Sequence, residues 1–142
     1  MNSLFQSHAP QESILMYAEK LSPLIRRFPQ DAEALRRMER FLGDFETRRA
    51  KDLPLMRLNP SRMFDILQAG STSRLSRIIS ILIEGRVFRR QIVVRFPSGS
   101  GITFASYTEL PAIIRDPVKD IDVEVTEENI EPSYILVTND AG

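Results

Sequence analysis

The chain has 142 residues, of which 42% are hydrophobic and 27% charged, and its formal net charge is zero. This length is enough to bury a proper core, so we expect one domain, or one domain with an arm. The chain has no cysteine, which excludes disulfides and thiolate metal sites and gives no support to an oxidising compartment. No apolar run approaches the ~18 residues of a membrane span, and the N-terminus lacks the features of a signal peptide. We therefore expect a cytoplasmic protein with no membrane contact.

The net charge of zero conceals a division of the chain. Residues 1–95 contain 17 Lys and Arg against 10 Asp and Glu, whereas residues 96–142 contain two against nine. Arginine outnumbers lysine 16 to 3, and planar guanidinium groups donate paired hydrogen bonds that suit phosphates and base edges. The alternative is a set of solvated surface charges together with ion pairs to the acidic end.

Two helices are predicted in the first third of the chain, after a flexible leader at residues 1–9. The first covers Gln11 to Phe28, where Ser22-Pro23 is either a kink or the start of a second short helix. The second runs from Asp31 to about Arg49, and apolar residues recur at helical spacing along it. Its predicted buried stripe consists of Leu35, Met38, Leu42 and Phe45. Asp52 to Leu58 is short and apolar, and is predicted as a small strand.

The stretch from Asn59 to Tyr107 is predicted as a helix, a tight turn, a second helix and a two-stranded hairpin. Asn59 and Pro60 suit the start of the first helix, and Gly70 suits its end. The second helix covers Arg74 to Glu84, with its polar residues on another face from its apolar ones. Its predicted core stripe consists of Leu75, Ile78, Ile79 and Leu82, and its partner-facing side of Arg74, Arg77 and Ser80.

The hairpin is predicted between Arg86 and Tyr107, with its turn at Pro97 to Gly101 and its returning strand at Ile102 to Tyr107. Alternation along the first strand predicts a core face and a solvent face. The core face consists of Phe88, Ile92, Val94 and Phe96, and the solvent face of Arg89, Gln91 and Arg95. The serine–glycine turn lacks the lysine and the helix of a phosphate-binding loop, so no nucleotide site is expected there.

The acidic end of the chain is predicted to be a β extension of the same domain. Thr108 to Arg115 is predicted as a short helical turn that Pro117 ends. Strands are predicted at Ile121 to Val125 and Ser133 to Thr138, with an acidic turn at Thr126 to Glu131 between them. Because apolar and acidic residues alternate in the first of these strands, we expect the segment to be anchored to the domain rather than free.

The residues offer little for catalysis. The only histidine, His8, lies in the leader, which leaves neither a histidine base nor a histidine metal cluster. The acidic residues between Asp120 and Glu131 lack the spacing of a calcium-binding loop. No serine lies in the strand–turn–helix context that activates a nucleophile. We therefore expect no enzyme, no cofactor and no metal site.

The order of these elements resembles the winged helix-turn-helix superfamily over about residues 31–107. The stretch Ser71 to Ile79 is also similar to the recognition helices of bacterial multiple-antibiotic-resistance-type regulators. The resemblance implies an α+β fold with a winged-helix domain at residues 30–107. The N-terminal helical segment at 10–29 and the acidic β extension at 108–142, which we expect to pack on the same domain, lie outside the minimal winged helix. Those regulators usually continue into long dimerisation helices, so their dimer architecture and ligand sensing are not expected here.

Two functions follow from this resemblance. The first is a bacterial or phage transcriptional regulator that binds double-stranded DNA, with the second helix of the pair in the major groove and hairpin arginines on the flanking backbone. The predicted DNA-binding residues are Ser73, Arg74, Arg77, Ser80, Arg89 and Arg95. Since Arg74 and Arg77 avoid the core stripe and have no acidic neighbour on their own helix, reversing both charges is expected to abolish DNA binding without unfolding.

The second function is a winged-helix adaptor in a larger assembly, which would use the same arginines on an acidic protein. Its contacts would include the C-terminal strand and the acidic face. The oligomeric state is open, because the apolar side of the helix Gln11 to Phe28 is either a homodimer contact or a brace on the domain.

Overall fold

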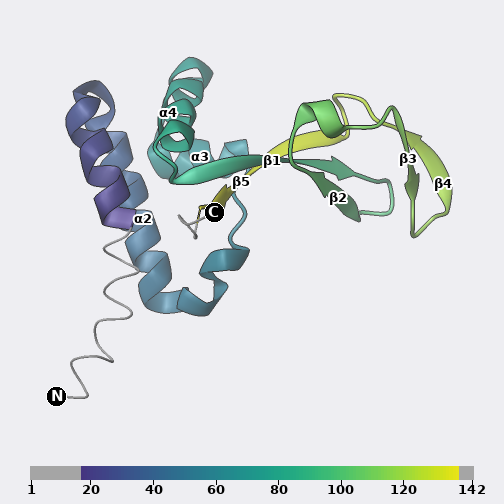
Figure 1. The fold of residues 1–142 in the computed structure, drawn as a ribbon, viewed down its shortest axis with the longest axis horizontal. Helices are drawn as coiled ribbons and strands as arrows, with labels where there is room; N and C mark the ends of the chain where they lie inside the picture. Colours follow the sequence, from purple (N-terminus) through teal and green to yellow (C-terminus); the bar gives the residue numbers. More distant parts are fainter. Residues whose placement is uncertain (1–16, 138–142) are drawn as a thin grey trace.

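The computed structural model describes residues 17–137, which form an α+β fold (Figure 1). A first helix covers residues 17–27, and a short 3-10 helix η1 (Pro29–Asp31) leads into α2 (Ala32–Arg49). The 3-10 helix η2 (Ala50–Leu55), α3 (Pro60–Leu67) and α4 (Thr72–Glu84) complete the helical body, which we define as residues 17–87. The strands are β1 (Phe88–Arg95), β2 (Gly101–Phe104), β3 (Ile113–Asp116), β4 (Ile121–Glu124) and β5 (Ile130–Leu136), with a 3-10 helix η3 (Tyr107–Glu109) between β2 and β3.

The helical body buries the apolar stripes that the sequence predicts. Leu35, Met38 and Leu42 of α2 are buried, whereas Phe45 is only half-buried. The first helix contributes Tyr17, Leu21 and Leu24 to the same core. This helix continues through Pro23 without interruption, so no second short helix starts there. The part of the predicted helix before residue 17, like the leader, lies outside the described residues.

α3 begins at the predicted cap Asn59, and α4 begins at Thr72, two residues before the predicted start, with Ser71 as its cap. The Asn59 side chain accepts a hydrogen bond from the Arg62 backbone N–H at 2.8 Å, and Ser71 Oγ accepts from the Arg74 N–H at 3.2 Å. These bonds satisfy backbone donors that the first turn of a helix leaves without partners. The end of α3 differs from the prediction, because Gln68 takes the left-handed conformation at φ 50°, two residues before Gly70.

The predicted small strand at Asp52 to Leu58 is wrong over most of its length. Residues Ala50–Leu55 form η2 instead, and Leu58 alone makes a β-bridge. Its N–H donates to the Tyr134 carbonyl at 3.0 Å, and the Tyr134 N–H donates back at 2.7 Å. The proline inside η2 removes a ladder donor, and the apolar residues Leu53 and Met56 are buried without forming a strand.

The predicted hairpin forms only over the second half of β1, next to the turn. β2 pairs with residues 92–95 of β1, whereas β5 pairs antiparallel with β1 from Phe88↔Leu136 to Val94↔Ile130. The sheet order is β2-β1-β5, and Leu58 bridges to β5 on its other side. β5 pairs with the other edge of β1 and makes the longer ladder, because its buried Tyr134 and Leu136 join the core of the helical body, which the partly exposed β2 does not.

Residues 96–129 form a second, smaller lobe that β1 and β5 join to the helices (Figure 1). We call these residues the distal lobe and the β1–β5 pair the arm. The predicted helical turn from Thr108 to Arg115 is wrong, because η3 ends at Glu109 and β3 follows. The predicted strand from Ile121 is confirmed as β4, which pairs with β3 in a two-stranded sheet.

Buried Asp116 holds the distal lobe together. Its Oδ1 accepts hydrogen bonds from the Ser98 hydroxyl at 3.0 Å and from the backbone N–H groups of Val118 at 2.9 Å and Lys119 at 3.3 Å. Burial raises the pKa of this carboxyl, but its hydrogen bonds with Val118, Lys119 and Ser98 together outweigh burial and leave the pKa below its ordinary value. The serine–glycine turn is therefore fastened to the β3–β4 hairpin. Within residues 17–137, no helix is both long and apolar enough to cross a bilayer.

Candidate nucleic-acid interface

The predicted interface centres on α4, which buries one side and exposes the other. The predicted stripe Leu75, Ile78, Ile79 and Leu82 is buried, and Ile81 is buried as well. The exposed side consists of Thr72, Ser73, Ser76, Arg77, Ser80 and Glu84. Ser76 is an exposed hydroxyl that the prediction missed. The helical spacing 73, 76, 77, 80 would have identified it together with the other residues.

Arg77 makes a two-pronged ion pair with Asp31, the last residue of η1. Arg77 Nε donates to Asp31 Oδ2 at 3.1 Å, and Nη2 donates to Oδ1 at 2.8 Å. Arg74 Nε adds a longer contact to Oδ1 at 3.4 Å. The Asp31 side chain is only 3% exposed, whereas those of Arg74 and Arg77 are 32% and 53% exposed. The pair therefore has a buried anion and cations that reach the surface.

The protonation equilibria agree with this geometry. The hydrogen bond from Arg77 holds the pKa of Asp31 below its ordinary value, against an opposing effect of burial, and Arg74 lowers it further. The same hydrogen bond raises the pKa of Arg77. A carboxylate that is taken out of water must be paired to remain charged, so the first turns of α4 are fastened to the start of α2.

This pair changes what the sequence implied about Arg74 and Arg77. Both residues avoid the core stripe, as predicted, but their acidic partner lies more than 40 positions away in the chain. Reversing both charges would place carboxylates beside buried Asp31. The expectation that such a variant keeps its fold is therefore unsupported, because two like charges would meet where one is already buried.

The arginines of β1 lie on two faces of the arm. Arg89 and Arg95 are exposed, as predicted, on the face opposite the buried Phe88 and Ile92. Arg90 belongs to the core face, where its guanidinium lies 5.7 Å from the centre of the Tyr134 ring. Arg89 and Arg95 are six residues apart, which is about 20 Å along a strand.

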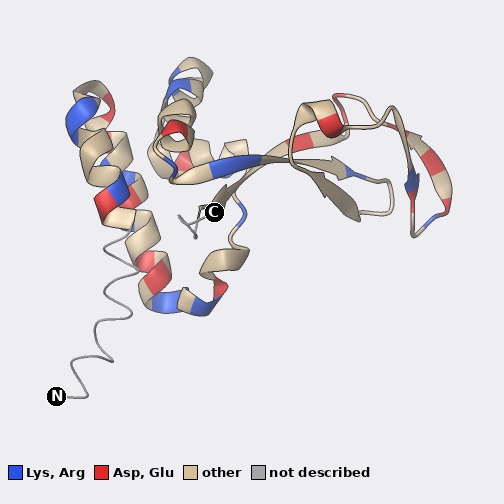
Figure 2. Ribbon diagram, viewed as in Figure 1, with Lys and Arg blue, Asp and Glu red and all other residues tan. Residues whose placement is uncertain are grey.

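The structure does not bring the six predicted residues to one point. Arg74 and Arg77 belong to the first turns of α4, whereas β1 begins four residues after the helix ends. The 13 residues of α4 span about 20 Å. Figure 2 shows Lys and Arg along the helices and the first part of β1, and Asp and Glu recurring in the distal lobe. Any nucleic-acid contact that uses all six residues would therefore need an elongated surface that extends from the start of α4 to the arm.

The remaining site predictions concern nucleotides, metals and catalysis. Ser98 bonds to Asp116 and to Ser100 Oγ, so the serine–glycine turn has partners within the lobe. Among residues 17–137, no group of three or more His, Cys, Asp or Glu side chains is placed to hold a metal ion. His8 lies outside the described residues. No protein-family model, curated protein or solved structure matches the chain.

Proposed function

We propose that this chain is a winged-helix protein whose helical body and arm bind double-stranded DNA, as a bacterial or phage transcriptional regulator. The observation that carries the proposal is the spatial order of the elements. α2 is followed by the bridging residue Leu58, by α3 and by α4, and the sheet then places β5 between Leu58 and β1. This order is similar to the one that the resemblance implies, except that the single bridging residue Leu58 stands in place of the short strand and β5 is the main partner of β1. Residues 96–129 would then be an enlarged wing.

The exposed side of α4 offers the groups that read a major groove. Ser73, Ser76 and Ser80 present hydroxyls, which donate to or accept from base edges and phosphates. Arg77 keeps more than half of its side chain exposed while Asp31 fixes its position. A guanidinium that is already oriented loses less conformational freedom when it binds a phosphate.

The distribution of charge along the chain also favours DNA binding by the helical body and the arm. Residues 17–95 carry 17 Lys and Arg against nine Asp and Glu, whereas the distal lobe carries two against seven. Phosphates attract the first set and repel the second, and the arm separates the two (Figures 1 and 2). Arg89 and Arg95 would then contact the backbone beside the groove, and the lobe would point away from the duplex.

The test is a salt titration of binding to labelled duplexes of unrelated sequence, measured by fluorescence anisotropy. We assume that Arg77, Arg89 and Arg95 each neutralise one phosphate. A plot of the logarithm of the affinity against the logarithm of the salt concentration should then have a slope of about −2.7. Reversing Arg89 and Arg95 to Glu reduces the magnitude of that slope by about two.

A second variant tests α4 and keeps both Asp31 and Arg77 in the chain. Ser73→Glu with Ser80→Glu puts two carboxylates on exposed positions, and affinity is expected to fall at least about tenfold while the protein stays folded. Ser61→Glu with Thr103→Glu makes the same charge change at exposed positions elsewhere. Equal affinities for these two variants would exclude α4 as the contact.

The adaptor function is the second candidate, and one observation favours it. Asp31 already neutralises the arginine that would lead the DNA contact, while the wing ends in an acidic lobe with exposed apolar side chains. Such a lobe suits a protein surface better than a phosphate backbone. Failure to bind any duplex at low salt would leave the adaptor as the better proposal.

A further inference from the structure

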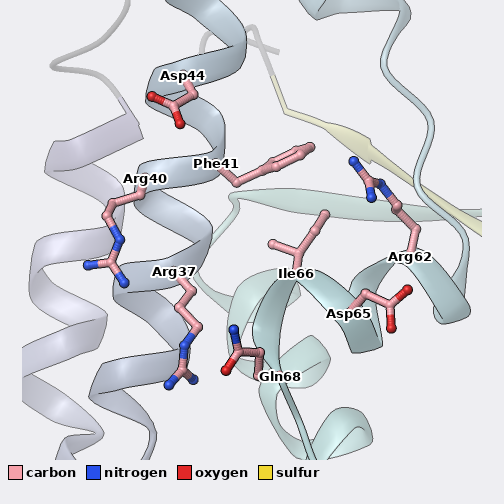
Figure 3. Close-up of a pocket in the computed structure, with 8 residues that line it drawn as sticks. All are labelled: Arg37, Arg40, Phe41, Asp44, Arg62, Asp65, Ile66 and Gln68. Carbon is pink, nitrogen blue, oxygen red and sulfur yellow. The ribbon is translucent and has the colours of Figure 1, made fainter.

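A groove runs between α2 and α3 and has a volume of about 400 Å³. Phe41 of α2 and Ile66 of α3 form its apolar part. The polar residues of its lining are Arg37, Arg40, Asp44, Arg62, Asp65 and Gln68 (Figure 3). Figure 3 shows Phe41 extending from α2 toward α3, where Arg62 faces it. The Arg62 guanidinium lies 5.5 Å from the centre of the Phe41 ring.

The groove continues into a second hollow of about 500 Å³ beside η2. Phe41 and Arg62 line both hollows, and the Phe45 ring, 6.2 Å from that of Phe41, extends the apolar surface. Leu55 lies in the second hollow and is 69% exposed. Within the described part of the helical body, it is the one large hydrophobic side chain that is strongly exposed. We call the two hollows together the α2–α3 groove.

The arginines of this groove are largely free of carboxylate partners. Arg37 donates to the Leu67 carbonyl, and Arg57 donates to the carbonyls of Pro54 and Met56. Among residues 17–137, neither these two nor Arg40 and Arg62 form an ion pair. Five arginines and three aspartates, Asp44, Asp52 and Asp65, line the two hollows. The α2–α3 groove thus combines apolar surface with a net positive charge.

The distal lobe has the complementary properties. Its four strongly exposed large hydrophobic residues are Tyr107, Ile113, Val118 and Ile121. Arg115 is paired with Asp120 and Asp122, so Glu124, Glu127 and Glu128 remain exposed without an ion pair in the described part of the chain. Ile113 and Glu124 are directly opposite each other on β3 and β4, which places an apolar and an acidic side chain together.

The lobe also has little core of its own. In residues 96–129 only Phe96 and Asp116 are buried, and β3 and β4 form a separate two-stranded sheet. A two-stranded hairpin is marginally stable in water unless it packs on another surface. Burial of its exposed apolar side chains would therefore stabilise the lobe.

The arm prevents the lobe from reaching the groove of its own chain. The eight residues of β1 extend about 27 Å in a straight ladder with β5, and they carry the lobe away from the helices (Figure 1). An intermolecular contact has no such constraint.

We propose that the α2–α3 groove of one copy binds the distal lobe of a second copy. The apolar side chains of β3 and β4 pack on Phe41, Phe45 and Leu55, and the lobe glutamates pair with the groove arginines. The two surfaces differ, so the contact is heterologous and each copy carries one half of it. This self-association goes beyond DNA binding and does not depend on it.

Sedimentation velocity of the full chain tests the proposal. We expect the weight-average mass to rise above the monomer as concentration increases to about 100 µM. At an ionic strength of about 1 M the Debye length falls to about 3 Å, and the association should weaken strongly. A mass that stays at the monomer value at low salt over this range would overturn the proposal.

Complementation between two variants tests the pairing of the surfaces. Arg40→Glu with Arg62→Glu damages the groove, and Ile113→Asn with Glu124→Lys damages the lobe. Each variant alone should associate at least about tenfold more weakly. An equimolar mixture still contains one intact groove and one intact lobe, so it should form a one-to-one complex. The control Arg26→Glu with Arg27→Glu has the charge change of the groove variant and should associate like the parent.

Two results of this comparison would contradict the proposal. One is association of both single-surface variants at the parent's strength, and the other is a mixture of folded variants that remains monomeric. Far-UV circular dichroism establishes that each variant is folded. If the strand variant unfolds, Glu127→Lys with Glu128→Lys replaces it, because both residues lie in an exposed turn outside β3 and β4.

Discussion

The Asp31 ion pair allows a prediction about stability and its dependence on pH. In Asp31→Asn the carboxylate that accepts two good hydrogen bonds from Arg77 is lost. A hydrogen bond to a charged group contributes about 1.5–3 kcal/mol. The guanidinium groups that lose this partner are partly exposed and can hydrogen-bond to water instead. The loss for the whole ion pair should therefore be near the lower end of this range. The free energy of unfolding should fall by about 2 kcal/mol, which corresponds to a melting temperature lower by about 4–8 °C.

The pH dependence distinguishes this electrostatic contribution from a packing defect. The folded-state pKa of Asp31 lies below its ordinary value of 3.8, so the carboxylate binds fewer protons in the folded than in the unfolded chain. Its contribution is complete above that ordinary value and is lost as the pH falls through the folded-state pKa. The stability difference between parent and Asp31→Asn should therefore be constant near neutrality and shrink progressively below pH 3.8.

Urea unfolding followed by circular dichroism, at pH 7 and at several acidic pH values, measures both quantities. A difference that persists unchanged at low pH would show that the asparagine disturbs packing and that the ion pair is not what stabilises this contact. DNA binding gives a second readout, because the Asp31→Asn change leaves Arg74 and Arg77 in the chain. Loss of binding in a folded Asp31→Asn protein would show that the carboxylate positions the arginines.

Gly85→Ala should destabilise the protein by about 1–2 kcal/mol in thermal melts, since the added Cβ would lie 2.6 Å from Leu24 Cδ1 and 2.9 Å from Cδ2; adding Leu24→Ala should cost less than the sum of the single changes. Ser98→Ala removes one donor to buried Asp116, so it should cost about 1 kcal/mol and speed amide exchange in β3 and β4 while leaving α4 protected. Burial raises the pKa of Glu46, whose Oε2 has no hydrogen-bond partner, so the folded protein is penalised as the pH rises above the ordinary value of 4.5. Glu46→Gln should therefore raise the free energy of unfolding at pH 7 by about 1 kcal/mol, with no gain below that value; an equal gain at acidic pH would contradict this cause.

The helices were predictable because their signals are local. Capping by Asn59 and Ser71 depends on residues three positions away, and the apolar stripes of α2 and α4 repeat within each helix. The exposed positions of Ser73 and Ser80 follow from the same periodicity. Such signals do not depend on the rest of the chain.

Two features were missed because distant segments decide them: the main partner of β1 and the partner of Arg77. The turn at Pro97 to Gly101 does reverse the chain, but the main partner of β1 comes from residues 130–136. No local pattern in β1 distinguishes a neighbouring strand from a distant one. Asp31 likewise lies 46 positions from Arg77, outside the neighbours that a helix can bring together. The exposed position of Arg77 could be predicted from the sequence, but its pairing with Asp31 could not, because the fold brings the two residues together.

The arm has a consequence for how the molecule approaches a partner. It separates a cationic helical body from an anionic lobe along one axis, so we expect an electric dipole moment along the arm although the net charge of the chain is zero. A strongly charged surface exerts little net force on such a molecule at long range but exerts a torque that turns it. Near a polyanion the helices would face inward and the lobe outward before any contact forms. Orientation in solution would then be determined by the direction of the arm, and it would be lost as salt screens the field.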